Sequence, residues 1–156
     1  MRVTKRSNIA LRVLMFCAVR ADERITKSDI AAACNASEHH LGQIVNRLAQ
    51  LGYLETRRGR YGGLALGQPA TEIRVGSIFR AFEENVLLVE CFSEETNTCP
   101  LVSCCRLRDA LVAAAEAFYA SLDGVSLDDL VSGNEDLYGI LGSQAAQSVA
   151  VACRPH

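Results

Sequence analysis

Apolar residues recur along this chain with helical spacing more often than with strand-like alternation. The stretch from Ile9 to Val19 is almost entirely apolar and only Arg12 interrupts it, which predicts a buried helix. Thr26 is followed three positions later by Asp29, which is the pattern of a capping box. We therefore expect a second, short helix that continues to Cys34.

A third helix is predicted from Glu38 to Leu51, before Gly52. One of its faces is an apolar stripe, whereas the opposite face carries amides, imidazoles and a guanidinium. Such groups hydrogen-bond base edges and phosphates, although a solvated surface is the alternative. The candidate DNA-contacting residues of this helix and its cap are Ser37, His39, His40, Gln43, Asn46 and Arg47.

A short hairpin is predicted after the third helix. Residues 53–57 form the first strand, residues 58–63 a glycine-rich turn and residues 64–66 the return strand. Two short helices, a polar-faced helix and a basic hairpin make a winged helix-turn-helix, whose hairpin contacts DNA through Arg57, Arg58, Arg60 and Tyr61. The turn lacks the Gly-Lys-Ser/Thr ending and the following helix of a phosphate-binding loop, which argues against nucleotide binding.

The second half of the chain is predicted to contain one long helix. After a short helix over residues 73–82, the segment 106–122 has no Gly or Pro and is apolar on two sides. In a chain this small, we expect a partner subunit to bury the second apolar side of this helix. Packing against other elements of the same chain is the alternative. The fold class is therefore mainly α: a winged helix-turn-helix DNA-binding domain with a long C-terminal dimerisation helix.

The distribution of charge supports this division. The chain has 156 residues and a formal net charge of −2, but residues 1–80 carry 13 basic and 6 acidic side chains, and residues 81–156 carry 3 basic and 12 acidic ones. A basic half that contains a DNA-binding pattern is expected to meet a polyanion. No stretch approaches the apolar length of a membrane span, and we expect a cytoplasmic protein with no membrane partner.

Three of the seven cysteines form the main candidate for chemistry. Cys91, Cys99 and Cys105 share neither the paired spacing of a structural zinc site nor a Cys-x-x-Cys redox motif. Three thiolates on a loop can hold an iron–sulfur cluster, and Cys105 opens the long helix, where the dipole favours a negative ligand set. Unliganded or redox-active cysteines remain the alternative. Cys17 and Cys34 are expected in the core.

The motifs taken together resemble a known family. Residues 57–64 of the hairpin, the segment Cys91…Cys99…Cys105-Arg106-Leu107 and Ser126 to Leu130 are similar to bacterial winged-helix repressors that hold an iron–sulfur cluster. The resemblance extends over residues 1–140 and is closest to the nitric-oxide-sensing, NsrR-type members. RirA-type iron-responsive and IscR-type members are the relatives.

This resemblance implies a homodimer in which Cys91, Cys99 and Cys105 ligate a cluster, of [4Fe–4S] or [2Fe–2S] type. Many nitric-oxide-sensing relatives supply Asp at the eighth position as the fourth ligand, whereas this chain has Asn8. Asn8 and Cys104 are thus candidates for the fourth ligand. The expected DNA partner is a double-stranded operator, a pseudo-palindrome with half-sites about one helical turn apart.

The predicted organisation follows from these assignments. Residues 1–82 are the DNA-binding domain, 83–105 the cluster-binding loop, 106–142 the dimerisation helix with a short C-terminal helix, and 143–156 a flexible tail. The predicted function is a repressor, not an enzyme, that senses nitric oxide and releases its operator. The alternatives are an iron-responsive repressor of RirA type, a cluster-free thiol-redox regulator, and an electron-transfer protein that uses the same cysteines.

Overall fold

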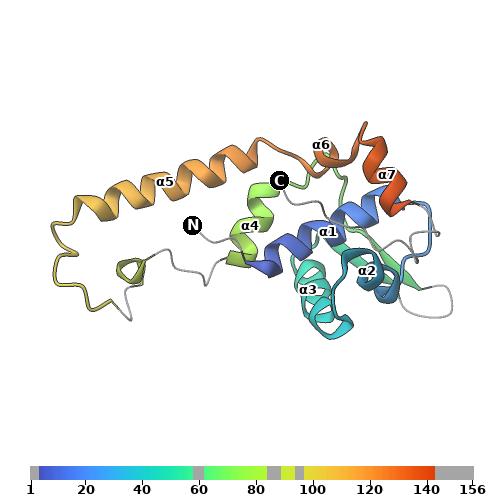
Figure 1. Ribbon diagram of the computed structural model, residues 1–156, viewed down its shortest axis with the longest axis horizontal. Coiled ribbons are helices and arrows are strands. Elements are labelled where there is room, and N and C mark those ends of the chain that lie inside the picture. Colours follow the sequence, from blue (N-terminus) through green and yellow to red (C-terminus); the bar gives the residue numbers. More distant parts are fainter. Residues whose placement is uncertain (1–3, 58–61, 84–88, 94–96, 143–156) are drawn as a thin grey trace.

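Two parts make up the molecule, a winged-helix body and an arm that projects from it (Figure 1). The computed structural model describes residues 4–57, 62–83, 89–93 and 97–142. The arm consists of the cysteine segment and the long helix α5, and it runs away from the other labelled helices. The predicted wing residues Arg58, Arg60 and Tyr61 and the predicted tail 143–156 lie outside the described residues.

Helix α1 (Lys5–Val19) is the centre of the body. It begins one turn earlier than its apolar run predicts, because Thr4 caps it by accepting a hydrogen bond from the backbone N–H of Ser7. It packs against α2, α3, α4, α6, α7 and β2. Contacts on so many sides explain why its apolar residues do not form a single stripe, and why Ala10, Val13 and Leu14 have no exposed surface.

The helix-turn-helix follows as predicted. Helix α2 (Lys27–Cys34) starts with the capping box of Thr26 and Asp29, and it ends at Asn35 in the left-handed conformation. Helix α3 (Glu38–Gln50) is capped by Ser37, and Gly52, with φ of 79°, turns the chain out of it.

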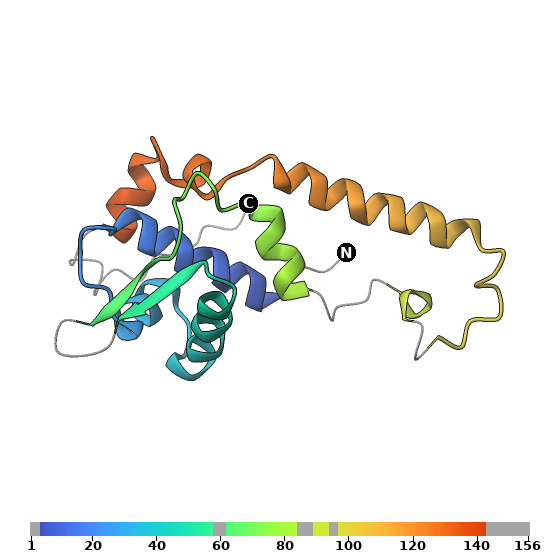
Figure 2. The ribbon, with the colours of Figure 1, turned by 180° about the vertical axis from the view of Figure 1, so that it is seen from behind.

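Two antiparallel strands form the wing, β1 (Leu54–Arg57) and β2 (Gly63–Leu66), which Figure 2 shows beside α3. Leu54 pairs with Leu66 and Arg57 with Gly63. Leu54 and Leu64 are buried in the body, so the hairpin is anchored by its inner face.

The arm leaves and re-enters the body at α4 (Val75–Glu83). A short 3-10 turn, η1 (Glu90–Phe92), precedes α5 (Arg106–Asp123), whose limits agree with the predicted helix. Among the described residues of α5 none is buried, and Leu107 keeps 66% of its surface exposed. Cover by a second subunit therefore remains a prediction. No described helix is both long and apolar enough to cross a membrane.

Two short helices bring the chain back to the body. Helix α6 (Leu127–Val131) begins with a second capping box, made by Ser126 and Asp129, and its Leu127 is fully buried in the core. Helix α7 (Glu135–Leu141) has Asn134 as its N-cap residue and packs against α1. The sequence pattern predicts α6 but not α7.

Candidate nucleic-acid interface and cysteine segment

Helix α3 presents the polar face that its sequence predicts. Leu41, Ile44, Val45 and Leu48 are fully buried against α1, α2 and β1. His39, Gln43 and Asn46 are exposed on the other side, while His40 and Arg47 are half-buried. Ser37 is exposed too, but its hydroxyl accepts the His40 N–H at 3.4 Å and so caps the helix. The packed side fixes the helix, and the exposed side is free of acidic residues beyond the first turn.

The wing is fixed where its return strand meets the segment before α2. The Leu64 N–H donates to the carbonyl oxygen of Ile25 at 2.9 Å, which adds Ile25 to the edge of the hairpin. Arg24 donates from Nε to the carbonyl oxygen of Gly62, also at 2.9 Å. Arg57 is the last residue of β1. No local sequence pattern indicates the contact of Arg24, since it joins residues 38 positions apart.

The three candidate cluster ligands stand on the arm. Cys91 lies in η1, Cys99 lies in the following loop and Cys105 is the N-cap residue of α5, and all three are half-buried. The start of α5 is the end of that helix farther from the body (Figure 1). Arg108 donates from Nε to the carbonyl oxygen of Cys91 at 3.2 Å, so it ties η1 to the first turn of α5.

The donor set fits an iron–sulfur cluster in chemistry, though the structure does not gather the sulfurs. Soft thiolates are the ligands that such clusters need, and the side chain of Cys105 makes no capping hydrogen bond that would compete for it. However, the described residues contain no group of three His, Cys, Asp or Glu side chains close enough to hold a metal ion. Ligation by Cys91, Cys99 and Cys105 therefore stays a prediction.

The two candidates for the fourth ligand occupy different places. Cys104 is exposed, beside Cys105 at the tip of the arm, and its Sγ lies 3.6 Å from the carbonyl oxygen of Leu101. Asn8 is exposed on the second turn of α1, in the body. Asn8 thus lies in the body whereas the candidate cysteines lie on the arm (Figure 1), and its service as the fourth ligand stays a prediction.

The remaining described cysteines are core residues, as predicted. Burial, and to a lesser degree the nearby Cys34, raises the pKa of the Cys17 thiol to about 12. Burial likewise raises the pKa of Cys34 to about 11, against the opposing charge of Arg12. Both thiols are thus held protonated and unreactive, so among the described cysteines those of the arm are the candidates for redox or metal chemistry.

A buried carboxylate joins the end of α4, where the arm begins, to the start of α1, and the sequence analysis did not predict it. Glu83, the last residue of α4, accepts hydrogen bonds at Oε1 from the Thr4 N–H at 2.9 Å, from the Thr4 hydroxyl at 2.7 Å and from the Ser7 hydroxyl. Only 8% of Glu83 is exposed. A signal was present, because Glu83 follows Gly76 by seven positions and Val75 by eight and so shares the inward face of α4.

Comparison with known proteins identifies the family. Residues 3–133 match Rrf2, described as an iron-dependent transcriptional regulator. The chain belongs to the Rrf2 family. One Rrf2-type relative, the HTH-type transcriptional regulator NsrR of Geobacillus kaustophilus, is 46% identical over 142 residues, which cover 90% of this chain and 97% of the relative.

Solved structures agree on the fold. IscR of T. potens superposes with a TM-score of 0.66 at 18% identity, over 83% of this chain and 85% of IscR. CymR of B. subtilis, titled a global cysteine regulator, superposes with a TM-score of 0.64 at 26% identity, over 85% of this chain and 97% of CymR. The winged-helix fold is therefore confirmed, and this Rrf2 protein is a transcriptional regulator and not an enzyme.

Proposed function

We propose that this Rrf2 protein is a homodimeric repressor that binds an operator through α3 and the wing and releases it when nitric oxide reaches an iron–sulfur cluster on its arm. The observation that carries the proposal is the placement of three half-buried thiols on one segment, whose two flanks both join the DNA-binding body at α4. The NsrR relative at 46% identity supports the choice of signal.

The body supplies DNA recognition. The exposed His39, Gln43 and Asn46 side chains carry donors and acceptors that suit base edges in a major groove. The arginines of the wing would contact the backbone or the minor groove beside it. Two such bodies related by a two-fold axis would cover two half-sites of a pseudo-palindrome.

The arm supplies the sensing site. Cys91, Cys99 and Cys105 would hold the cluster, and Asn8 of the second subunit or Cys104 would complete it. A cluster with one weak ligand supplies an iron that small molecules such as nitric oxide can attack. Arg108 keeps the main chain of Cys91 beside the start of α5, so the two outer ligands are tied to the same helical turn.

Iron and sulfide content tests the proposal first. Protein purified without oxygen should contain about four iron and four sulfide atoms per chain for [4Fe–4S], or about two of each for [2Fe–2S]. Cys91→Ser, Cys99→Ser and Cys105→Ser should each lose them, whereas Cys153→Ser, outside the proposed ligand set, should keep them. Wild-type protein without iron, or iron retained by all three variants, would refute the cluster proposal.

The choice of signal needs a second measurement, because the alternatives share the cysteines. Nitric oxide added to the cluster-containing dimer should abolish the gel mobility shift of operator DNA. Iron chelation in intact cells should leave the target genes repressed. The reverse result would favour the iron-responsive, RirA-type repressor. Release by peroxide and recovery by thiol reductant, in protein without iron, would favour a thiol switch that uses the exposed Cys104.

A further inference from the structure

The base of the wing is held by one charged side chain. Arg24 lies in the turn between α1 and α2, and its Nε donates to the carbonyl oxygen of Gly62 at 2.9 Å. The next residue, Ile25, accepts from the Leu64 N–H at 2.9 Å. Arg24 and Ile25 of the turn therefore bind Gly62 and Leu64, at the start of the return strand.

Gly63 shows how closely the two segments approach each other at this joint. A Cβ atom built on Gly63 would lie 2.9 Å from the carbonyl oxygen of Ile25 and 3.5 Å from Cγ of Arg24. The first of these contacts is too close for any side chain, so the return strand lies directly on the backbone of the turn.

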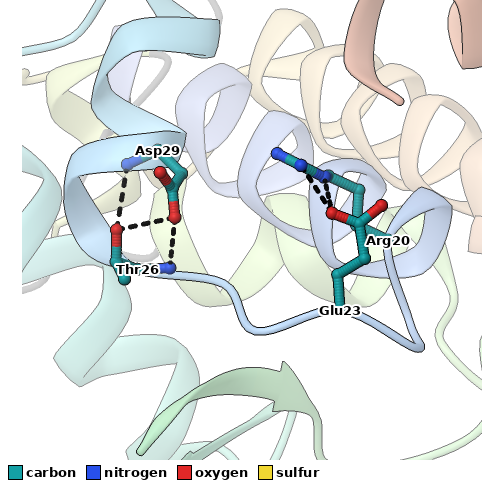
Figure 3. Close-up of polar contacts among 4 residues, drawn as sticks. All are labelled: Arg20, Glu23, Thr26 and Asp29. Atoms are coloured by element: carbon teal, nitrogen blue, oxygen red, sulfur yellow. Dashed lines mark hydrogen bonds and ion pairs between the residues drawn. The ribbon is translucent and has the colours of Figure 1, made fainter. Parts of the chain in front are cut away.

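The turn itself is pinned on both sides of Arg24 (Figure 3). Before it, Arg20 donates from Nε to Glu23 at 2.8 Å. After it, Thr26 and Asp29 form the capping box, with the Thr26 N–H donating to Oδ2 of Asp29 at 2.8 Å. Because these contacts fix the backbone, Arg24 is presented to the wing from a rigid support.

We propose that Arg24 is a positioning residue for DNA recognition, because its Nε–H holds the Gly62 carbonyl and so sets the angle at which the arginines of the wing meet the duplex. The proposal rests on the proposed operator binding. It assigns Arg24 an effect through the hydrogen bond, not through its charge. A positioning role predicts that a neutral side chain with a donor in the same place is sufficient.

Two neutral variants separate the hydrogen bond from the charge. In Arg24→Gln the amide nitrogen lies the same number of bonds from Cα as Nε of arginine, so the donor is kept, whereas Arg24→Met keeps the length and loses the donor. The probe is a duplex that the wild-type dimer selects from a random pool about 30 base pairs long, enough for two half-sites. We expect Arg24→Met to weaken binding about tenfold, the value of one hydrogen bond, and Arg24→Gln to bind within about twofold of wild type.

A double-mutant cycle with Arg60→Ala tests whether Arg24 acts through the wing. If it does, Arg60→Ala should cost much less in the Arg24→Met background than in wild type. Full additivity, equal weakening by Gln and Met, or wild-type binding by Arg24→Met would each overturn the proposal. Gly63→Ala perturbs the same joint from the other strand, and it should reproduce the Arg24→Met result.

The outcome also distinguishes the positioning role of Arg24 from the proposed operator binding on which it rests. Failure of the wild-type protein to select any duplex would reject the proposed operator binding itself. Selection of a duplex by wild type, followed by equal binding of all Arg24 variants, would reject only the positioning role. Thermal unfolding of each variant checks that the exposed position of Arg24 leaves the fold intact.

Discussion

Substitution of Glu83 should loosen the junction between the arm and the DNA-binding body. The carboxylate accepts from three donors of Thr4 and Ser7 at the start of α1, and a hydrogen bond to a charged group contributes about 1.5–3 kcal/mol. Burial of the charge opposes this gain, and among the described residues Oε2 has no hydrogen-bond partner.

The net effect of Glu83→Ala is therefore smaller than the sum of three bonds. The two hydroxyls retain each other as partners, since Oγ1 of Thr4 lies 3.1 Å from Oγ of Ser7. What remains is the loss of the acceptor for the Thr4 N–H, the loss of negative charge at a helix N-terminus and a small void. We expect a destabilisation of about 2 kcal/mol.

Urea unfolding of the cluster-free protein measures this change, with the exposed Glu72→Ala as the control for loss of one negative charge. Glu83→Gln keeps an acceptor at Oε1 but places an amide N–H₂ where Oε2 is buried, so it should fall between alanine and wild type. Operator affinity should also change in Glu83→Ala although no cysteine is altered. Equal unfolding midpoints for Glu83→Ala, Glu72→Ala and wild type would refute the assignment.

Three further experiments test the packing, a helix cap and a buried thiol. Gly76→Ala should destabilise α4 by about 1–3 kcal/mol, because its Cβ would lie 2.7 Å from a carbonyl oxygen of α5, whereas Gly42→Ala meets nothing within 4 Å and should stabilise; thermal unfolding compares the two. Thr26→Val should cost about 1 kcal/mol at neutral pH. Hydrogen bonds from Thr26 lower the pKa of Asp29, so the part of this difference that depends on the carboxylate should be present above pH 4 and be lost as the pH falls through the folded pKa in an acid titration. The loss of the Thr26 hydroxyl as acceptor for the Asp29 N–H remains at every pH. Cys17 should resist iodoacetamide at pH 8 while the protein is folded, as mass spectrometry would show.

The local features of the fold were accessible from the sequence. Helical periodicity placed α3 and α5, and the capping patterns at Thr26 and Ser37 marked the starts of α2 and α3 correctly. These signals work because a cap and the first turn of its helix are neighbours in sequence. Helix α7 was missed because its seven residues, Glu135–Leu141, are too few for a clear helical period and no capping pattern was recognised at Asn134.

The contacts that join distant parts of the chain could not be predicted in the same way. Glu83 meets Ser7 across 76 positions, and nothing in the local pattern of either residue identifies the other. The spacing of the cysteines has the same limit, because it identifies three thiols that share a segment but does not determine the distances between their sulfur atoms. The candidate ligands were thus accessible from sequence, whereas their arrangement was not.

The last turn of α4 is where the arm closes onto the body. Glu83 anchors the departing chain against α1, and Arg80, three residues earlier, holds the returning chain with 2.7 Å contacts to both carboxylate oxygens of Asp123. Arg80 also lies 4.9 Å above the ring of Tyr119, and Phe79 packs edge-on against Phe118 at 6.1 Å. Both flanks of the cysteine segment therefore end on one helical turn. In the proposed function, a change in the separation of those flanks would act on this turn, and because α4 packs on α1 and α1 on α3, it would reach the proposed DNA-contacting helix α3 by that route.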